Sequence, residues 1–166
     1  MTTERRHPNV IHRDEVEPTI VERGRHRFRR RTFGPMTGSR KLGGSLMELA
    51  PGAVSYPFHF HCANEEAIYI VSGRGTVRIG DRRVAVGAGD WIALPVGPEH
   101  AHQMINDGDT PLVYLVVATD HKCEVIGYPD SKKVAAFGGE TWDDPWVREY
   151  KRAGASLDYW DGEPEA

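Results

Sequence analysis

The feature that most restricts the fold is a succession of short apolar or alternating runs, each bounded by Gly, Pro, Asn or Asp. They are SLMELAP (45–51), EAIYIVSG (66–73), GTVRIGDRRVAVGAGD (75–90), WIALPVG (91–97), AHQMIN (101–106) and LVYLVVATD (112–120). Runs of this length between turn residues predict β-strands, and their regular spacing is typical of a sandwich or barrel. Gly80-Asp81 predicts a tight hairpin between two of them. We therefore expect an all-β domain.

The chain has 166 residues, the usual size of one domain, and its 18 Gly and 11 Pro fit a domain rich in turns. We expect an extended N-terminal arm (1–34), a barrel domain (35–139) and a short C-terminal tail (140–166). The tail is polar, yet it carries side chains that are too apolar to be left in water, namely Trp142, Trp146 and Trp160. It is therefore predicted to pack on the barrel, with a helix possible over 146–152.

The charged side chains are distributed unevenly. Residues 1–42 carry eleven Lys and Arg against five acids, whereas residues 140–166 carry three against eight, so the ends have net charges of about +6 and −5. Every second residue from Arg23 to Arg29 is an arginine, which would form one charged face of an extended segment. Because few aromatic residues and no reader motif accompany this face, nucleic acid is not an expected partner. The opposite charges instead predict a homodimer whose ends pair across protomers.

The cysteine content and the hydropathy predict a cytoplasmic protein without a membrane partner. Two cysteines are too few for a disulfide framework, and no apolar run approaches the roughly 20 residues of a membrane span. The first ten residues, MTTERRHPNV, also lack the apolar segment of a signal peptide.

The stretch HFHCANEEAIYIVSGRG (59–75) concentrates metal-binding side chains at the start of predicted strands. Because side chains alternate along a strand, its two histidines share one face. The candidate ligands here and in the later segment PVGPEHAHQMIN are His59, His61, Glu65 or Glu66, and His100 or His102. Imidazole nitrogens combined with a carboxylate oxygen suit Zn, Mn, Fe or Ni. One divalent metal ion is therefore the expected cofactor.

These residues resemble the paired motifs of the cupin superfamily over about residues 42–120. The first motif, G-x5-H-x-H-x3-4-E-x6-G, is matched, with one additional residue before the first histidine, by Gly52, His59, His61, Glu66 and Gly73. The second, G-x5-P-x-G-x2-H-x3-N, begins with Gly89, Pro95 and Gly97. Beyond Gly97 the match is irregular, because two different histidines satisfy its two parts. His100 has the expected distance from Gly97, whereas His102 has the expected distance from Asn106.

The resemblance implies a small antiparallel β-barrel, the double-stranded β-helix or jelly roll, which is commonly dimeric and holds one metal ion. By their distances from Gly73 and Asn106, the ligands that it implies are His59, His61, Glu66 and His102. Two segments outside the barrel motifs, YPDSKKV (128–134) and YWDGE (159–163), also resemble elements of a poorly characterised bacterial group of single-domain cupins.

The family alone does not select a reaction, because cupins include isomerases and epimerases, dioxygenases and decarboxylases as well as storage and sugar-binding proteins. The complete ligand set favours a metal-dependent enzyme that acts on a small polar or anionic metabolite. The alternative is a non-catalytic module that binds a small molecule or a sugar. For a catalytic acid or base, the sequence offers Glu65, His100 and Tyr56.

Overall fold

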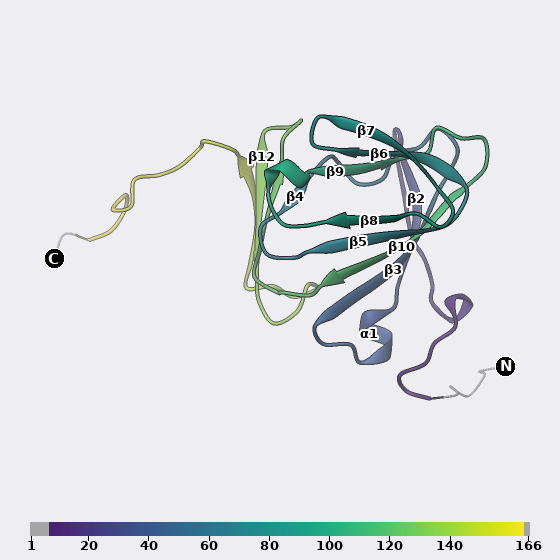
Figure 1. Ribbon diagram of the computed structural model, residues 1–166. Coiled ribbons are helices and arrows are strands. Elements are labelled where there is room, and N and C mark those ends of the chain that lie inside the picture. Colours follow the sequence, from purple (N-terminus) through teal and green to yellow (C-terminus); the bar gives the residue numbers. More distant parts are fainter. Residues whose placement is uncertain (1–6, 165–166) are drawn as a thin grey trace.

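The computed structural model describes residues 7–164, which consist mainly of antiparallel β-strands (Figure 1). The elements in chain order are η1 (Arg13–Glu15), β1 (Thr19–Arg23), β2 (His26–Thr32), α1 (Gly34–Thr37), β3 (Leu42–Leu49), β4 (Phe60–His61), β5 (Glu66–Ser72), β6 (Arg74–Ile79), β7 (Arg82–Gly87), β8 (Trp91–Leu94), η2 (Pro98–His100), β9 (His102–Ile105), β10 (Leu112–Thr119), β11 (Glu124–Tyr128), β12 (Lys133–Gly138) and β13 (Val147–Arg152). The all-β prediction is confirmed. The helices within residues 7–164 are short turns, and none of them has the length or the apolar character needed to cross a membrane.

Backbone hydrogen bonds divide the strands of residues 7–164 into three sheets, with the orders β1-β2-β3-β10-β5-β8, β13-β12-β11-β4 and β7-β6-β9. The six-stranded and three-stranded sheets face each other as two layers, and β11, β12 and β4 lie across one end (Figure 1). The predicted hairpin at Gly80 joins β6 to β7, with this glycine at φ 55°. This arrangement is the jelly roll that the sequence predicts.

The alternation of side chains along β5 shows how a polar residue comes to face the core. Ile68 and Ile70 are buried between the layers, whereas Tyr69 and Val71 are exposed on the outer face. Glu66 is in phase with Ile68, so its carboxylate points toward the interior. The strand therefore places one acidic side chain on the same inner face as the apolar Ile68 and Ile70.

Backbone pairing also brings together the two histidine-bearing segments. His59 and His102 form an antiparallel bridge, in which the His59 N–H donates to the His102 carbonyl at 3.2 Å and the reverse bond measures 2.7 Å. Two residues farther along, β4 pairs with β11 through His61 and Ile126. Segments about forty residues apart are thus held side by side by main-chain bonds.

Asn106, the last residue of the second motif, is fully buried and stabilises the fold. Its amide donates to the carbonyls of Leu49 and Thr110, both at 2.9 Å, and its carbonyl accepts from the Gly108 N–H at 3.1 Å. The side chain therefore ties the end of β3 to the loop between β9 and β10. This motif residue therefore helps to fix the sheet that carries His102.

Part of the predicted N-terminal arm belongs to the main sheet. Residues 19–32 form the β1–β2 hairpin, β2 pairs with β3, and Phe28 is a core residue with 4% of its surface exposed. The alternate arginines of this segment are exposed, as an extended charged face requires. Residues 1–6 of the arm and 165–166 of the tail lie outside the described residues.

The tail differs from the prediction in two respects. The prediction of a helix over 146–152 is wrong, because Val147–Arg152 is strand β13, which pairs with the edge of β12. Trp142 does pack, since its ring lies 5.6 Å from that of Phe137 and its indole N–H donates to Asp120 at 2.7 Å. Trp146 and Trp160, however, are 76% and 71% exposed. The edge of β12 offers backbone groups to pair with, and such pairing does not bury the side chains of the added segment.

Candidate metal centre

Four side chains with metal-binding atoms converge between the layers of the jelly roll. His59 precedes β4, His61 lies in β4, Glu66 begins β5 and His102 begins β9. One ligand atom from each lies within 4.8 Å of the others. The four side chains are buried or half-buried, and His102 is only 5% exposed. The structure thus brings together the four residues that the family resemblance implies, from both facing layers and the end sheet.

Each of the three histidines has its Nδ1 atom next to an oxygen that can only accept a hydrogen bond. His59 Nδ1 lies 2.7 Å from the Pro57 carbonyl, and His102 Nδ1 lies 3.0 Å from the His100 carbonyl. His61 Nδ1 lies 3.3 Å from a carboxylate oxygen of Glu124. These acceptors place the proton on Nδ1, so that Nε2 is left to offer its lone pair to an ion.

Two of these Nε2 atoms, those of His61 and His102, lie beside the same carboxylate. Glu66 Oε2 lies 3.1 Å from Nε2 of His102 and 3.7 Å from Nε2 of His61. Within the described residues, Nε2 of His61 is buried and has no hydrogen-bond partner. Imidazole lone pairs and an ionised carboxylate repel one another unless they share a cation. A divalent metal ion therefore fits this donor set.

The pKa shifts follow from burial and from these contacts. Burial, reinforced by the neighbouring His102 and His61, lowers the pKa of His59 to about 3, so this imidazole is neutral near pH 7. Burial alone would raise the pKa of Glu66, but in the metal-free protein a hydrogen bond from protonated His102 and the charge of protonated His61 lower it to about 2. A bound cation would take the place of these protons. A neutral imidazole and an ionised carboxylate are the forms that bind metals.

Glu124 is a functional residue that the sequence reasoning missed. It is 3% exposed at the start of β11, where its carboxylate accepts from the N–H groups of Cys62, Ala63 and Asn64 at 2.9 to 3.1 Å. Burial would raise the pKa of Glu124, but its bonds to His61 and to these N–H groups lower it to about 2. The ionised carboxylate thus orients His61 and holds the loop between β4 and β5. A single acid at the start of an apolar run gave no sign of this role.

Tyr128 is a second residue whose place the motifs did not reveal. Its ring lies nearly parallel to that of His59, with 6.1 Å between centroids and an interplanar angle of 26°. The ammonium group of Lys133 lies 4.4 Å from the centre of the Tyr128 ring. Both residues belong to YPDSKKV, the segment that the sequence singled out without a role. This segment therefore packs on His59 from the β11–β12 hairpin.

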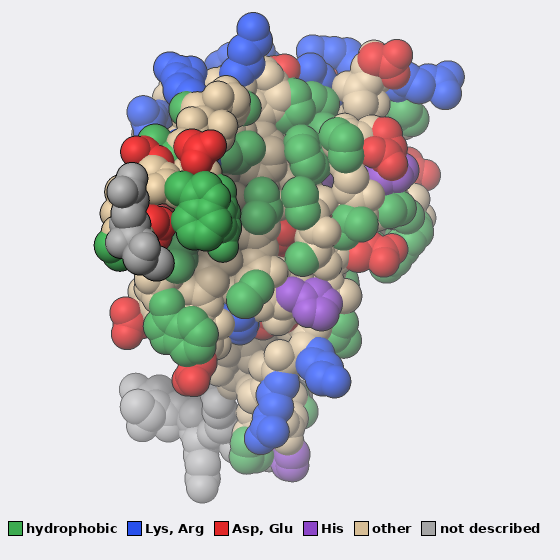
Figure 2. Space-filling view, turned by 90° about the vertical axis from the view of Figure 1, so that its left-hand side faces the viewer, with side chains coloured by type: hydrophobic (Ala, Val, Ile, Leu, Met, Phe, Trp, Pro, Cys, Tyr) green, Lys and Arg blue, Asp and Glu red, His purple; other side chains and the backbone are tan. Residues whose placement is uncertain are grey.

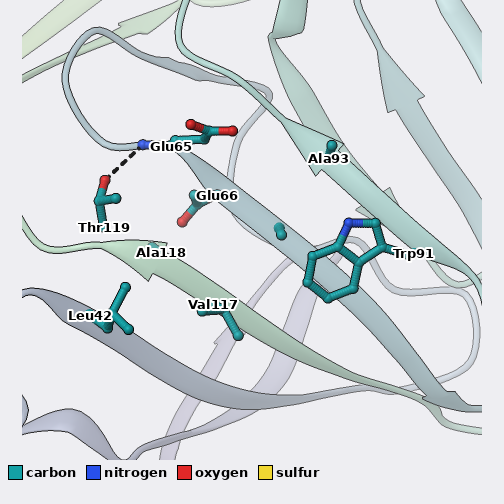
Figure 3. Close-up of a pocket in the computed structure, with 9 residues that line it drawn as sticks. Leu42, Glu65, Glu66, Trp91, Ala93, Val117, Ala118 and Thr119 are labelled. Atoms are coloured by element: carbon teal, nitrogen blue, oxygen red, sulfur yellow. Dashed lines mark hydrogen bonds between the residues drawn. The ribbon is translucent and has the colours of Figure 1, made fainter.

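The three candidate catalytic residues occupy different places. Glu65 is exposed and its N–H donates to Thr119 Oγ1 at 2.9 Å, beside a shallow groove on the outer face of the main sheet (Figure 3). His100 is half-buried in η2 with its Nε2 3.7 Å from Glu99, while its carbonyl holds His102. Tyr56 packs its ring against the core residue Phe28 at 4.7 Å between centroids. Tyr56 therefore reaches the inner side, whereas Glu65 lies on the opposite face.

Replacing Glu124 with Gln tests its orienting role. An amide would turn one N–H group toward the backbone donors of residues 62–64, so we expect the metal-free protein to lose on the order of 2 kcal/mol of stability. The affinity for Mn²⁺ or Zn²⁺ should fall about 10- to 100-fold, because His61 is no longer held. Urea denaturation and isothermal titration measure both effects. The control Glu65→Gln makes the same chemical change on the outer face; equal effects of both variants would contradict the role.

The comparisons with known proteins agree with this geometry. Residues 45–118 match the family model of the cupin domain. The chain is similar to the solved structure of a sugar phosphate isomerase of the cupin superfamily from Silicibacter pomeroyi, with 26% identity, a TM-score of 0.74, and coverage of 89% of this chain and 95% of that one. It is also similar to a protein from Acidithiobacillus ferrooxidans, provisionally described as a sugar phosphate isomerase, with 27% identity, a TM-score of 0.70, and coverage of 78% and 86%.

Among curated proteins, an uncharacterised protein of Methanocaldococcus jannaschii is 37% identical over 57 residues. The matched stretch is 34% of this chain and spans 44% of that relative. Residues 45–118, which match the cupin domain, contain all four of the converging side chains. From its fold, its paired motifs and its relatives, the chain belongs to the cupin superfamily.

Proposed function

We propose that this cupin binds one divalent metal ion, Zn, Mn, Fe or Ni, and is an enzyme for a small anionic metabolite. The ligands are His59, His61, Glu66 and His102. The observation that carries the proposal is the buried Nε2 of His61, which has no hydrogen-bond partner among residues 7–164 and lies beside the Glu66 carboxylate. The bound ion would act as a Lewis acid on a carbonyl or hydroxyl oxygen of the substrate. Neutral imidazoles and one carboxylate leave it a charge of about +1, which favours an anionic ligand.

Within this class we propose the interconversion of an aldose phosphate and a ketose phosphate. This choice among isomerase, dioxygenase and decarboxylase chemistry is supported by the two similar structures described as sugar phosphate isomerases, which cover 89% and 78% of the chain. Such a reaction moves a proton between neighbouring carbons, and this requires a group that gives and takes a proton at the site. Of the sequence candidates we propose Tyr56, because its ring reaches the inner side of the main sheet.

The metal assignment predicts which members of each candidate pair matter. Glu66→Ala and His102→Ala should strip the metal, since each removes a ligand atom from the cluster. Glu65→Ala should retain the metal, because the carboxylate of Glu65 lies on the outer face. His100→Ala should also retain it, because the substitution leaves in place the backbone carbonyl of residue 100 that holds His102. Elemental analysis of the purified proteins measures the metal content and identifies the metal. Equal metal loss from His100→Ala would contradict the assignment.

The proposed reaction predicts that the metal-loaded protein interconverts aldose and ketose phosphates in an NMR assay of a substrate panel. Turnover should stop on metal chelation and in Glu66→Ala, and Tyr56→Phe should lower kcat by about 100-fold or more while retaining the metal. Binding of a panel member without turnover would instead support the alternative, a non-catalytic small-molecule or sugar-binding module. Turnover that persists after chelation would contradict the metal's role.

We further propose that the protein forms a homodimer through its oppositely charged ends. The arginines of the β1–β2 hairpin are exposed, and the acidic C-terminal region carries exposed aromatic side chains, namely Trp146, Tyr150, Tyr159 and Trp160. Hydrophobic side chains gather on the face of the molecule on the β12 side (Figure 2). A second copy that covers them would remove apolar surface from water.

Deleting residues 154–166 tests the dimer, because it removes Tyr159 and Trp160 but leaves β13 and every core residue in place. We expect the truncated chain to elute as a monomer in size-exclusion chromatography with light scattering at about 0.15 M salt. Deletion of residues 1–34 is a poor test, since it removes Phe28 from the core. A dimer that persists after the tail truncation would place the interface elsewhere.

A further inference from the structure

Arg30 is an arginine that points into the jelly roll. In β2 it lies opposite Met47, which in turn lies opposite Tyr114 of β10, and both of these side chains are 2% exposed. Its neighbour Arg29 lies opposite Glu48 and is exposed on the other face. Because side chains alternate along a strand, Arg30 shares the inner face with the core residues.

Within the described part of the chain, the guanidinium of Arg30 has only neutral hydrogen-bond partners. Its Nε donates to Ser45 Oγ at 3.0 Å, and one terminal nitrogen donates to the Tyr56 hydroxyl at 3.3 Å. Among residues 7–164, no carboxylate forms an ion pair with it, whereas the next residue, Arg31, pairs with Glu48 at 2.7 Å. A half-buried cation without an anion is costly, and a bound anion would offset that cost.

Contacts connect Arg30 to the metal ligands. Tyr56, which receives the bond from Arg30, is three residues before His59, and its carbonyl accepts from the side chain of Gln103, the neighbour of His102, at 2.8 Å. The hydroxyl of the buried Tyr114 is affected by both charged groups. Burial raises the pKa of its hydroxyl, the Glu66 carboxylate raises it further and the Arg30 guanidinium lowers it. Arg30 and the ligand Glu66 thus act on the same hydroxyl group.

We propose that Arg30 binds the phosphate group of the substrate while the metal centre binds its carbonyl and hydroxyl oxygens. This inference rests on the proposed function and names the residue that selects a phosphorylated substrate over the free sugar. Arginine suits this role because its planar fork of N–H groups matches phosphate oxygens with two parallel hydrogen bonds. The hydroxyls of Ser45 and Tyr56 already lie on the guanidinium and hold the fork in place.

The test measures binding of fructose 6-phosphate, fructose and inorganic phosphate by isothermal titration, with metal-loaded and metal-free protein. In Arg30→Gln, the affinity for fructose 6-phosphate should fall about tenfold or more, while the affinity for fructose and the metal content stay unchanged. Arg30→Lys keeps the charge but loses the fork and should give an intermediate loss. Arg29→Gln makes the same change on the exposed face of the same strand and should bind every probe as the wild type does.

The outcomes separate this inference from the proposed function. If Arg30→Gln binds fructose 6-phosphate as tightly as the wild type while metal and turnover are intact, Arg30 does not bind the phosphate and the proposed function stands. If no metal is bound but metal-free wild type holds inorganic phosphate and Arg30→Gln does not, the proposed function fails and the phosphate site stands. A wild type that binds neither phosphate probe, or an equal loss in Arg29→Gln, overturns the inference.

Discussion

The buried carboxylate of Glu124 accepts hydrogen bonds from the N–H groups of the loop between β4 and β5 and from Nδ1 of His61. This interaction determines the tautomer of His61 and the path of the chain that leads to Glu66. An ionised acid away from water is tolerable only because its hydrogen bonds come from many fixed donors. Without it, the loop would leave several N–H groups unsatisfied and His61 free to rotate. The rest of the centre depends on this anchor.

The period-two alternation of strands gives the molecule two chemically distinct surfaces. The outward side chains include Arg27 and Arg29 in β2 and Tyr69 and Val71 in β5. The inward side chains are core residues together with Arg30 in β2 and Glu66 in β5. A shift of one residue in either strand would exchange these sets. Main-chain bonds between His59 and His102 lock the register on the opposite side of the centre.

The polar and charged groups inside the jelly roll lack a full set of partners within the described chain. Glu66 is shared by two imidazoles, Nε2 of His61 is left without a partner in the described chain, and Arg30 meets only hydroxyls. Such groups destabilise an isolated fold but prepare it for a cation and an anion that arrive from outside. The apolar core and the hydrogen bonds of Asn106 supply the compensating stability.

The sequence by itself determined the strands, the hairpin at Gly80 and the four converging side chains, because turn residues, alternation and motif spacing are local properties of the chain. It could not identify Glu124, which meets His61 across 63 positions, nor the inward orientation of Arg30 within a run of arginines that looked like a solvated face. It also misjudged the tail, since backbone pairing with the edge of β12 satisfies β13 without burying Trp146. These features are decided by which strands pair and in what register, and that depends on packing between distant segments that no local pattern encodes.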